Sequence, residues 1–404
     1  MTTPFENRRV ILGVTGSIAA YKATDLASKL AQSGTLVDVI LTQAALEFIT
    51  PLSFQSVTGR PAFIDKDLWE REGHVLHIGL AKNASLLVIA PASANTLAKL
   101  AHGIADNLLT VTALAARCPM LLAPAMDGGM YINPATQNNL EILRQRGAIM
   151  VGPAEGHLAS GLTGIGRMVE PLELLGHIRL ELARDGIMRG RKVVVTAGGT
   201  QEPIDPVRSI TNRSSGKQGF ALAQAALDRG AKVILITGPT QLSAPIGVDR
   251  IDVQTAEQMH SAVLDAIPGT DVLIMAAAVA DFRPASPAAH KLKREKGVPQ
   301  IYLEPTPDIL ASVSQFKSTT GFPRVMIGFA AESQDLLSNA RRKLHAKGLD
   351  LIIANDITVT DAGFAVDTNR VTILDIGGGE ATLPLLSKSE VSEAVLERII
   401  GILG

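Results

Sequence analysis

The chain has 404 residues, more than one ordinary hydrophobic core accommodates, which predicts two or more domains. A formal net charge of −1 and an aromatic content of 3% argue against a basic, base-stacking nucleic-acid surface. The single cysteine, Cys118, excludes an internal disulfide and a thiolate metal cluster.

The first residues lack the long apolar run of a signal peptide, and no later run approaches the length needed to span a membrane. We therefore expect a cytoplasmic protein that binds neither membranes nor nucleic acids.

Short β-branched runs alternate with amphipathic helical stretches, which is typical of a parallel α/β sheet. In the first half the expected strands cover residues 8–14, 36–42, 86–92, 119–125 and 148–154. In the second half they cover residues 192–200, 231–239, 271–282, 325–333 and 349–357. Residues 370–386 indicate two further strands joined by a Gly-rich turn, with a helix after them. We predict an α/β protein of two Rossmann-like, doubly wound parallel-sheet domains, residues 1–190 and 191–404.

The first expected strand runs into a glycine turn and a helix, with the sequence GVTGSIAAYKA. Gly13 and Gly16 permit a tight turn, and the free N–H groups at the helix start suit an anion. The spacing is not the G-x-G-x-x-G fingerprint of dinucleotide-binding proteins, so NAD is disfavoured. By itself, the segment fits a purely structural turn equally well.

Three more polar or Gly-rich segments follow the next strands, with the sequences LTQAALEF, APASANTLAKLAHGIADNLLT and APAMDGGMY. Open parallel sheets bind ligands at these carboxyl ends of strands. Together the segments resemble the flavin-dependent cysteine decarboxylases, specifically the decarboxylase half of the bifunctional phosphopantothenoylcysteine decarboxylase/phosphopantothenate–cysteine ligase family. The resemblance implies a flavodoxin-like flavoprotein domain, an active-site histidine at His77, and FMN contacts from Gly16, Ser17, Thr42, Ser93, Asn95 and Asn107. Outside its motif, His77 would more simply be a structural residue.

A flavin suits this chemistry because loss of CO2 from a cysteine carboxylate would otherwise leave an unstabilised carbanion. Oxidation of the thiol to a thioaldehyde provides an electron sink, and the protein then orients the substrate and moves protons. The resulting enethiol must afterwards be reduced and protonated.

Two residues depart from the related motifs. The family's P-x-M-N-x-x-M reads PAMDGGM here, so Asp127 replaces the asparagine that grips the substrate carboxylate. Because an ionised Asp127 would repel that carboxylate, it is either protonated, which burial favours, or leaves the contact to its neighbours.

The second departure lies in the loop EGHLASGLTGIGRMVEP, where Ser160 replaces the family's proton-donating cysteine. A hydroxyl is a far weaker acid than a thiol, whose pKa is about 8.5. One hypothesis is that His157 supplies the proton, directly or through Ser160. The alternative is that His157 is an exposed loop residue.

The second half opens with TAGGTQEPIDPVRSITNRSSGKQGF, in which hydroxyls and a lysine precede an expected helix. This arrangement suits phosphate recognition, although it lacks the spacing of a Walker loop and by itself could be structural. Later segments read AAAVADFRP, HKLKR, PTPDIL, GFAAES and LDLIIANDI. The ordered set resembles the ligase half of the same bifunctional family.

The ligase resemblance implies that Asn212 handles an acyl-cytidylate and that Lys291 is a catalytic lysine. Without it, the basic run around Lys291 would be a solvated loop. The implied CTP site comprises Met275, Ala276, Ala277, Asp281, Lys291, Pro307, Asp308, Ile309, Leu310, Phe329, Lys343 and Lys347. Lysines and Mg2+ would stabilise the displaced pyrophosphate, although the sequence identifies no metal ligands.

These observations predict a bifunctional enzyme of coenzyme A biosynthesis. The second domain would join 4′-phosphopantothenate to cysteine with CTP, and the first would decarboxylate the product to 4′-phosphopantetheine with FMN. The resemblance also implies a homo-oligomer, with trimers of the first domain and dimers of the second, up to a dodecamer. Alternatively, the first domain stops at the oxidised enethiol or serves only as a flavin-binding assembly module.

Overall fold

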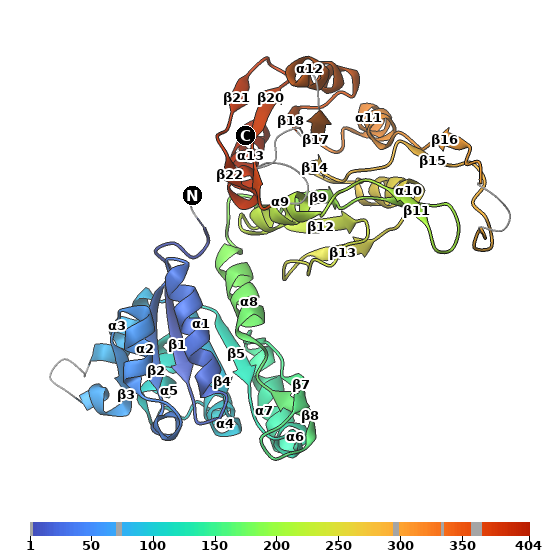
Figure 1. Ribbon diagram of the computed structural model, residues 1–404. Helices are drawn as coiled ribbons and strands as arrows, with labels where there is room; N and C mark the ends of the chain where they lie inside the picture. The colour runs from blue at the N-terminus through green and yellow to red at the C-terminus, as the bar shows by residue number, and fades with distance from the viewer. Residues whose placement is uncertain (1–2, 70–74, 294–298, 333–334, 357–365) are drawn as a thin grey trace. The chain divides into compact units, whose positions relative to one another are not determined.

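The computed structural model describes residues 3–69, 75–293, 299–332, 335–356 and 366–404 (Figure 1). The chain divides into two compact units, one extending to Ala183 and the other beginning at Arg184. The boundary that we predicted near residue 190 falls in the short segment after this division and before the first strand of the second unit.

Within the described residues, the N-terminal domain has a sheet of six parallel strands in the order β3-β2-β1-β4-β5-β6. The strands are β1 (Arg9–Val14), β2 (Leu36–Leu41), β3 (Ala62–Ile64), β4 (Leu86–Ala92), β5 (Met120–Pro124) and β6 (Ile149–Met150). The helices are α1 (Ala20–Gln32), α2 (Pro51–Thr58), α3 (Leu76–Asn83), α4 (Ala94–His102), α5 (Leu108–Ala115), α6 (Gly128–Ile132), α7 (Pro134–Gln145) and α8 (Pro171–Ala183), with 3-10 turns η1 (Gln43–Glu47) and η2 (Asp65–Trp69). A separate hairpin pairs β7 (Ala154–His157) with β8 (Thr163–Arg167).

Alternate residues of each strand point to opposite faces of this sheet, and packed helices bury both faces. Val10 and Leu12 of β1 pack in one apolar cluster with α1, α2 and α8. Ile11, between them, packs in a second cluster with residues of α3, α4, α5 and α7. The domain is therefore doubly wound, with helices on both faces.

The sheet of the C-terminal domain has the order β13-β12-β9-β14-β17-β18-β20-β21 among the described residues. Its strands are β9 (Lys192–Ala197), β12 (Lys232–Thr237), β13 (Asp249–Asp252), β14 (Val272–Met275), β17 (Val325–Glu332), β18 (Leu351–Asp356), β20 (Val371–Asp375) and β21 (Glu380–Thr382). The strands from β13 to β18 are parallel, and β20 and β21 add antiparallel pairs, as expected from their Gly-rich turn. The helices are α9 (Lys217–Leu227), α10 (Ala256–Ala266), α11 (Ile309–Thr320), α12 (Leu336–Ala346) and α13 (Lys388–Leu403).

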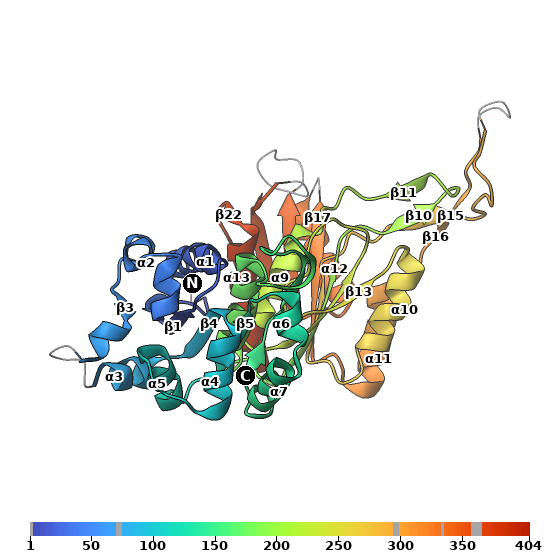
Figure 2. The same cartoon turned by 90° about the horizontal axis from the view of Figure 1, so that it is seen from below.

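Two hairpins extend from this sheet and lie side by side in both ribbon views (Figures 1 and 2). They are β10 (Gln201–Pro203) with β11 (Ser209–Thr211), and β15 (Phe282–Pro284) with β16 (Leu303–Pro305). A short third ladder joins β19 (Thr368–Asn369) to β22 (Leu386–Ser387). The predicted fold class, two doubly wound α/β domains, is confirmed.

None of the helices in the described part of the chain is both long and apolar enough to cross a bilayer. Cys118 is half-buried, and burial raises the pKa of its thiol, consistent with a packed side chain.

Candidate active sites

Each sheet reverses its winding direction at one pair of neighbouring strands, β1 and β4 in the first domain and β9 and β14 in the second. At such a switch point the loops leave the strands toward opposite faces and open a crevice. Each domain has a cavity there, of about 580 Å³ in the first and about 610 Å³ in the second.

The first cavity is built from the loops that follow β1, β4 and β5, together with the β7–β8 hairpin. Its lining residues are Gly16, Ser17, Ile18, Ala19, Tyr21, Lys22, Ser93, Ala94, Ala125, Met126, Asp127, Met130, His157, Leu158, Ala159, Ser160, Gly166, Arg167 and Met168. Of the residues predicted from the sequence, Gly16, Ser17, Ser93, Asp127, Ser160 and His157 meet here.

The loops after β1 and β4 are held together by one threonine. Thr15 donates a hydrogen bond from Oγ1 to the carbonyl of Pro91 (2.7 Å) and accepts one from the N–H of Ser93 (2.9 Å). The hydroxyls of Ser17 and Ser93 cap the chain turns that lead into α1 and α4. Hydroxyls and helix-start N–H groups therefore converge on one cavity, and this donor set fits the phosphate of a flavin nucleotide.

Gly16 permits the close approach of the β1–α1 turn to the segment after β2. A Cβ atom at this position would lie 2.6 Å from Ala44 Cβ and 3.1 Å from the carbonyl oxygen of Ala44. A side chain here would push the turn away from its present position.

Four predicted residues lie outside the lining of this cavity. Thr42 is buried at the end of β2, Asn95 is exposed on α4, and Asn107 caps α5 by accepting a hydrogen bond from the N–H of Thr110 (2.9 Å). His77 lies on α3, and its Nδ1 atom is buried without a hydrogen-bond partner in the described structure. Their predicted roles remain predictions.

The two departures from the related motifs contact each other. Asp127 accepts a hydrogen bond from the Ser160 hydroxyl at Oδ2 (2.7 Å) and one from the N–H of Gly129 at Oδ1 (2.9 Å). The Ser160 bond first, and then the Gly129 bond, hold the pKa of Asp127 below its ordinary value. In the ligand-free protein these two bonds favour the ionised form of Asp127, and the two alternatives stated above for its contact with the substrate carboxylate stay predictions.

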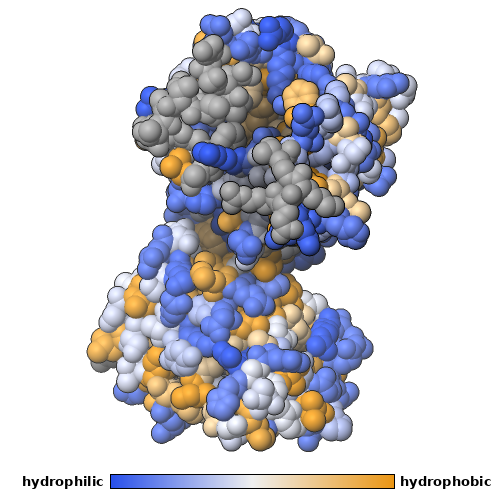
Figure 3. All heavy atoms as spheres, turned by 45° about the vertical axis from the view of Figure 1, so that its right-hand side comes forward, coloured by the Kyte–Doolittle hydropathy of each residue, from blue (hydrophilic) through white to orange (hydrophobic). Residues whose placement is uncertain are grey.

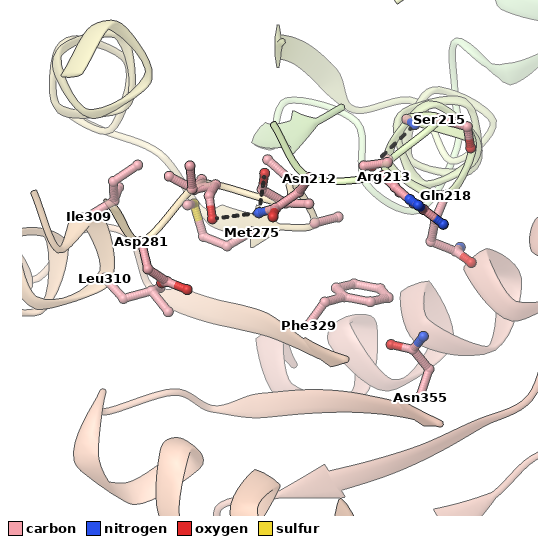
Figure 4. A pocket seen from close by; sticks show the side chains of 18 of the residues that line it. Asn212, Arg213, Ser215, Gln218, Met275, Asp281, Ile309, Leu310, Phe329 and Asn355 are labelled. Carbon is pink, nitrogen blue, oxygen red and sulfur yellow. Dashed lines mark hydrogen bonds between the residues drawn. The ribbon is translucent and has the colours of Figure 1, made fainter. Parts of the chain in front are cut away.

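The second cavity gathers the loop before α9, the segment after β14, the start of α11, and side chains from β17, α12 and β18 (Figure 4). The predicted site residues that line it are Asn212, Met275, Ala276, Ala277, Asp281, Pro307, Asp308, Ile309, Leu310, Phe329, Lys343 and Lys347. These residues are separated by up to 135 positions in the chain, and the parallel sheet brings them to one edge.

Asn212 bridges two walls of the second cavity. Its Nδ2 donates hydrogen bonds to the carbonyls of Ala278 (3.2 Å) and Val279 (3.1 Å), drawn as dashed lines in Figure 4. Both bonds use Nδ2, so the side-chain oxygen of Asn212 remains for a contact with a ligand.

Lys343 and Lys347 lie four residues apart on α12 and its C-terminal cap, and therefore reach the same cavity. Lys343 donates to the carbonyl of Phe329 (3.3 Å), and Lys347 pairs with Asp308 at the start of α11. The cavity thus carries cationic groups suited to phosphates.

Lys291 does not line the second cavity. It is exposed on the connection between β15 and β16, next to Leu292, whose N–H donates to Asp205 Oδ2 (3.1 Å). Burial alone would raise the pKa of Asp205. The pKa is nevertheless lowered overall, because the carboxylate accepts hydrogen bonds from the N–H groups of Val207, Leu292 and Arg208 and lies near the Arg208 charge. An ionised Asp205 thereby fixes the base of the segment that carries Lys291.

We expect the Asp308–Lys347 pair to stabilise the domain only while Asp308 is ionised. Burial favours the neutral acid, but the Lys347 hydrogen bond, the N–H of Ala311 and the charges of Lys347 and Lys343 lower the pKa of Asp308 overall. Because the folded-state pKa lies below the unfolded value of about 3.9, the stabilisation is complete above that pH and disappears as the pH falls through the folded-state pKa.

Asp308→Asn should therefore lower the thermal stability at neutral pH, by less than about 1 kcal/mol since the pair is half-exposed. The difference from the wild type should vanish in strong acid, as followed by thermal unfolding across pH. Asp185→Asn, which breaks an exposed pair with Arg189, is the control. A stability difference that grows on acidification would contradict the assignment.

Among the described residues, no group of three or more His, Cys, Asp or Glu side chains could hold a metal ion.

Two family models match the chain, the flavoprotein domain over residues 2–182 and the DNA/pantothenate metabolism flavoprotein C-terminal domain over residues 188–403. Over 396 residues the chain is 44% identical to the coenzyme A biosynthesis bifunctional protein CoaBC of Bacillus subtilis, and the match covers 97% of both chains. The chain belongs to this family of bifunctional coenzyme A biosynthesis proteins. The family resemblance seen in the sequence motifs is thereby confirmed.

The corresponding protein of Mycobacterium tuberculosis is 44% identical over 405 residues, covering 97% of this chain and 96% of that one. The crystal structure of a CoaBC C-terminal domain matches with a TM-score of 0.46 and 39% identity, covering 54% of this chain and 97% of that one.

Sequence reasoning did not assign several polar residues that line these cavities. In the second cavity they are Arg213, Lys217, Gln218, Asn355, Asn369 and Lys388, and in the first they are Tyr21 and Lys22. Lys217 is the lysine that the sequence pattern placed before a helix as suited to phosphate recognition, but it was not assigned to the CTP site. The buried Lys388 lies 171 residues later, and no local pattern connects it with that helix.

Proposed function

We propose that the C-terminal domain uses CTP to join 4′-phosphopantothenate to cysteine through an acyl-cytidylate. The N-terminal domain then decarboxylates 4′-phosphopantothenoylcysteine to 4′-phosphopantetheine with FMN. The observation that supports the ligase assignment is that twelve of the residues implied by the family resemblance line the second cavity together. Family membership over 97% of the chain supports both activities.

In the ligase domain, the carboxylate of 4′-phosphopantothenate attacks the α-phosphorus of CTP and displaces pyrophosphate. Lys343 and Lys347 stabilise the phosphate charge, and a bound Mg2+ ion would supply further positive charge there. Asn212 offers its side-chain oxygen to the acyl-cytidylate while its Nδ2 holds the segment after β14. The cysteine amine then attacks the acyl carbon and releases CMP. Lys291 would have to approach from the β15–β16 connection.

In the decarboxylase domain, Ser17, Ser93 and the N–H groups at the starts of α1 and α4 would hold the FMN phosphate. When bound, FMN supplies reversible two-electron oxidation of the substrate thiol. The β7–β8 hairpin excludes water from the cysteine end of the substrate and places Ser160 and His157 beside it. His77, Asn95 and Asn107 do not line the cavity of a single chain. Their roles in the decarboxylase would therefore be performed outside that cavity.

We further propose that the protein is a cytoplasmic homo-oligomer, with trimers of the first domain and dimers of the second. On the face drawn in Figure 3, apolar and polar side chains are interspersed. Large apolar side chains of the first domain are more than 60% exposed in the single chain, including Leu52, Trp69, Leu114, Ile132 and Leu172. Self-association would cover such side chains.

The test combines purified protein with 4′-phosphopantothenate, cysteine, CTP and Mg2+, and follows pyrophosphate, CO2 and product mass. Phosphopantothenoylcysteine without CO2 would leave only the ligase active and favour a flavin-binding assembly module. CO2 with a product two hydrogens short of 4′-phosphopantetheine would favour a domain that stops at the enethiol. No pyrophosphate release would contradict the ligase assignment.

A further inference from the structure

Ser160 lies at the tip of a hairpin whose base is fixed to the body of the domain. Lys22 of α1 is buried, and its Nζ donates to the carbonyl of Met168 (3.1 Å) and to Glu170 Oε1 (2.7 Å) beyond the end of β8. The N–H of Met126 donates to the carbonyl of Gly166 (3.0 Å). This approach requires glycine, since a Cβ at Gly166 would lie 2.2 Å from the carbonyl oxygen of Met126, at a φ of +142°.

The tip itself turns tightly over the cavity. The N–H of Leu158 donates to the carbonyl of Leu162 (2.7 Å), and the N–H of Gly161 donates to the carbonyl of Leu158 (2.9 Å). The Leu158 side chain is buried, and this packing holds the tip against the domain. These contacts hold the Ser160 hydroxyl at 2.7 Å from Asp127 Oδ2, with both residues lining the cavity.

A serine hydroxyl alone is too weak an acid to protonate a carbon atom efficiently, but a carboxylic acid hydrogen-bonded to it is strong enough. While Asp127 is ionised, it accepts the Ser160 proton. Once Asp127 is protonated, the same hydrogen bond can run in the opposite direction, from Oδ2 to Oγ. The Ser160 hydroxyl is then free to donate its own proton into the cavity.

We propose that Asp127 and Ser160 form the proton-delivery pair of the decarboxylase domain, in which Asp127 stores the proton and Ser160 passes it to the substrate carbon. This proposal rests on the proposed decarboxylation. It assigns to two residues of this chain the acid function that one hypothesis above gave to His157.

Substrate charge provides the means of loading and releasing this proton. A substrate carboxylate entering the same cavity raises the pKa of Asp127, because two like charges disfavour each other, and Asp127 takes a proton from solvent. When the carboxylate leaves as CO2, that repulsion disappears and Asp127 becomes a stronger acid. It becomes an acid at the stage at which the decarboxylated product needs a proton.

The proton balance closes in two transfers. The bond between the Ser160 hydroxyl oxygen and its proton breaks as a C–H bond forms on the enethiol carbon, and the Asp127 proton moves to Ser160 Oγ. A bound reduced flavin would supply the hydride equivalent that completes the reduction, and Asp127 returns to the ionised form. Other titratable side chains that line the cavity are Tyr21 and Lys22 on α1, His157 on β7 and Arg167 on β8.

The experiment uses the flavin-loaded full chain and phosphopantothenoylcysteine, with CO2 and product mass measured together. Asp127→Asn and Ser160→Ala should still release CO2, but formation of the fully reduced product should fall by about 100-fold or more. Asp127→Asn preserves the shape of the side chain and an oxygen for the Gly129 N–H. Glu155→Gln, which removes an exposed charge from the same hairpin, should behave like the wild type.

Ser160→Cys provides a second arm, since a thiol can donate without Asp127. The double variant Asp127→Asn/Ser160→Cys should regain the reduced product that Asp127→Asn alone loses. The proposed pair would be contradicted if Asp127→Asn formed the reduced product at the wild-type rate. It would also be contradicted if a folded, flavin-loaded double variant did not regain that product. Wild-type protein that releases no CO2 would instead contradict the proposed decarboxylation, on which the pair depends.

A measurement without turnover tests the contact itself. Because the Ser160 hydrogen bond is the largest contribution lowering the pKa of Asp127, Ser160→Ala should raise that pKa in the ligand-free protein. Carboxyl NMR titration of both proteins would detect the change. An unchanged pKa would contradict the coupling of the two side chains.

Discussion

Replacing Asn212 with aspartate is expected to reduce the ligase rate by about 100-fold or more while decarboxylation of added phosphopantothenoylcysteine continues at the wild-type rate. In the wild type, Nδ2 of Asn212 satisfies the carbonyls of Ala278 and Val279 (Figure 4). An ionised aspartate donates to neither carbonyl and is repelled by both. Each lost bond costs about 1–3 kcal/mol, and about 1.4 kcal/mol corresponds to a factor of ten in rate.

The measurement is pyrophosphate release with CTP, 4′-phosphopantothenate and cysteine, beside CO2 release from added phosphopantothenoylcysteine. Asn138→Asp makes the same charge change on the exposed side of α7 and should alter neither rate. Equal loss of both activities would indicate general misfolding. An unchanged ligase rate in Asn212→Asp would show that the bridge across the cavity is dispensable.

The strands of both central sheets could be predicted where β-branched runs are long and buried, as in β1 and β9. The edge strand β13 was missed because Asp249, Arg250 and Asp252 give it a polar pattern. Such charge is typical of an edge strand, which must avoid pairing with another chain. The β7–β8 hairpin was missed because its glycines are typical of a loop, whereas here they permit close packing of the hairpin against the segment after β5.

The residues of the second cavity could be predicted from the sequence more completely than the contacts within the first cavity. The residues around the second cavity lie in segments with recognisable motifs, and the parallel sheet brings the ends of those segments together. The contact between Asp127 and Ser160 spans 33 residues and joins two departures that lie in separate motifs. Periodicity and motif spacing contain no information on such a contact, which depends on how the hairpin folds back.

Replacing Gly16 with alanine is expected to lower the affinity for FMN by about 10-fold to 100-fold. The added Cβ would meet Ala44 Cβ at 2.6 Å, well inside the carbon–carbon contact distance of about 3.5–4.0 Å. The turn must therefore shift, and the N–H groups at the start of α1 would move away from the phosphate position proposed above. Hydrogen bonds to a charged group contribute about 1.5–3 kcal/mol each, so the loss of one accounts for this decrease.

The readouts are the visible absorbance of the purified protein and fluorescence titration of the flavin-free protein with FMN. Gly79→Ala is the matched control, since nothing lies within 4 Å of the added Cβ and helix α3 accommodates alanine. Ligase activity should persist in both variants because the second cavity lies in the other domain. Full FMN binding by Gly16→Ala would show that the β1–α1 turn does not bind the flavin. The phosphate would then have to bind elsewhere than at the switch point between β1 and β4.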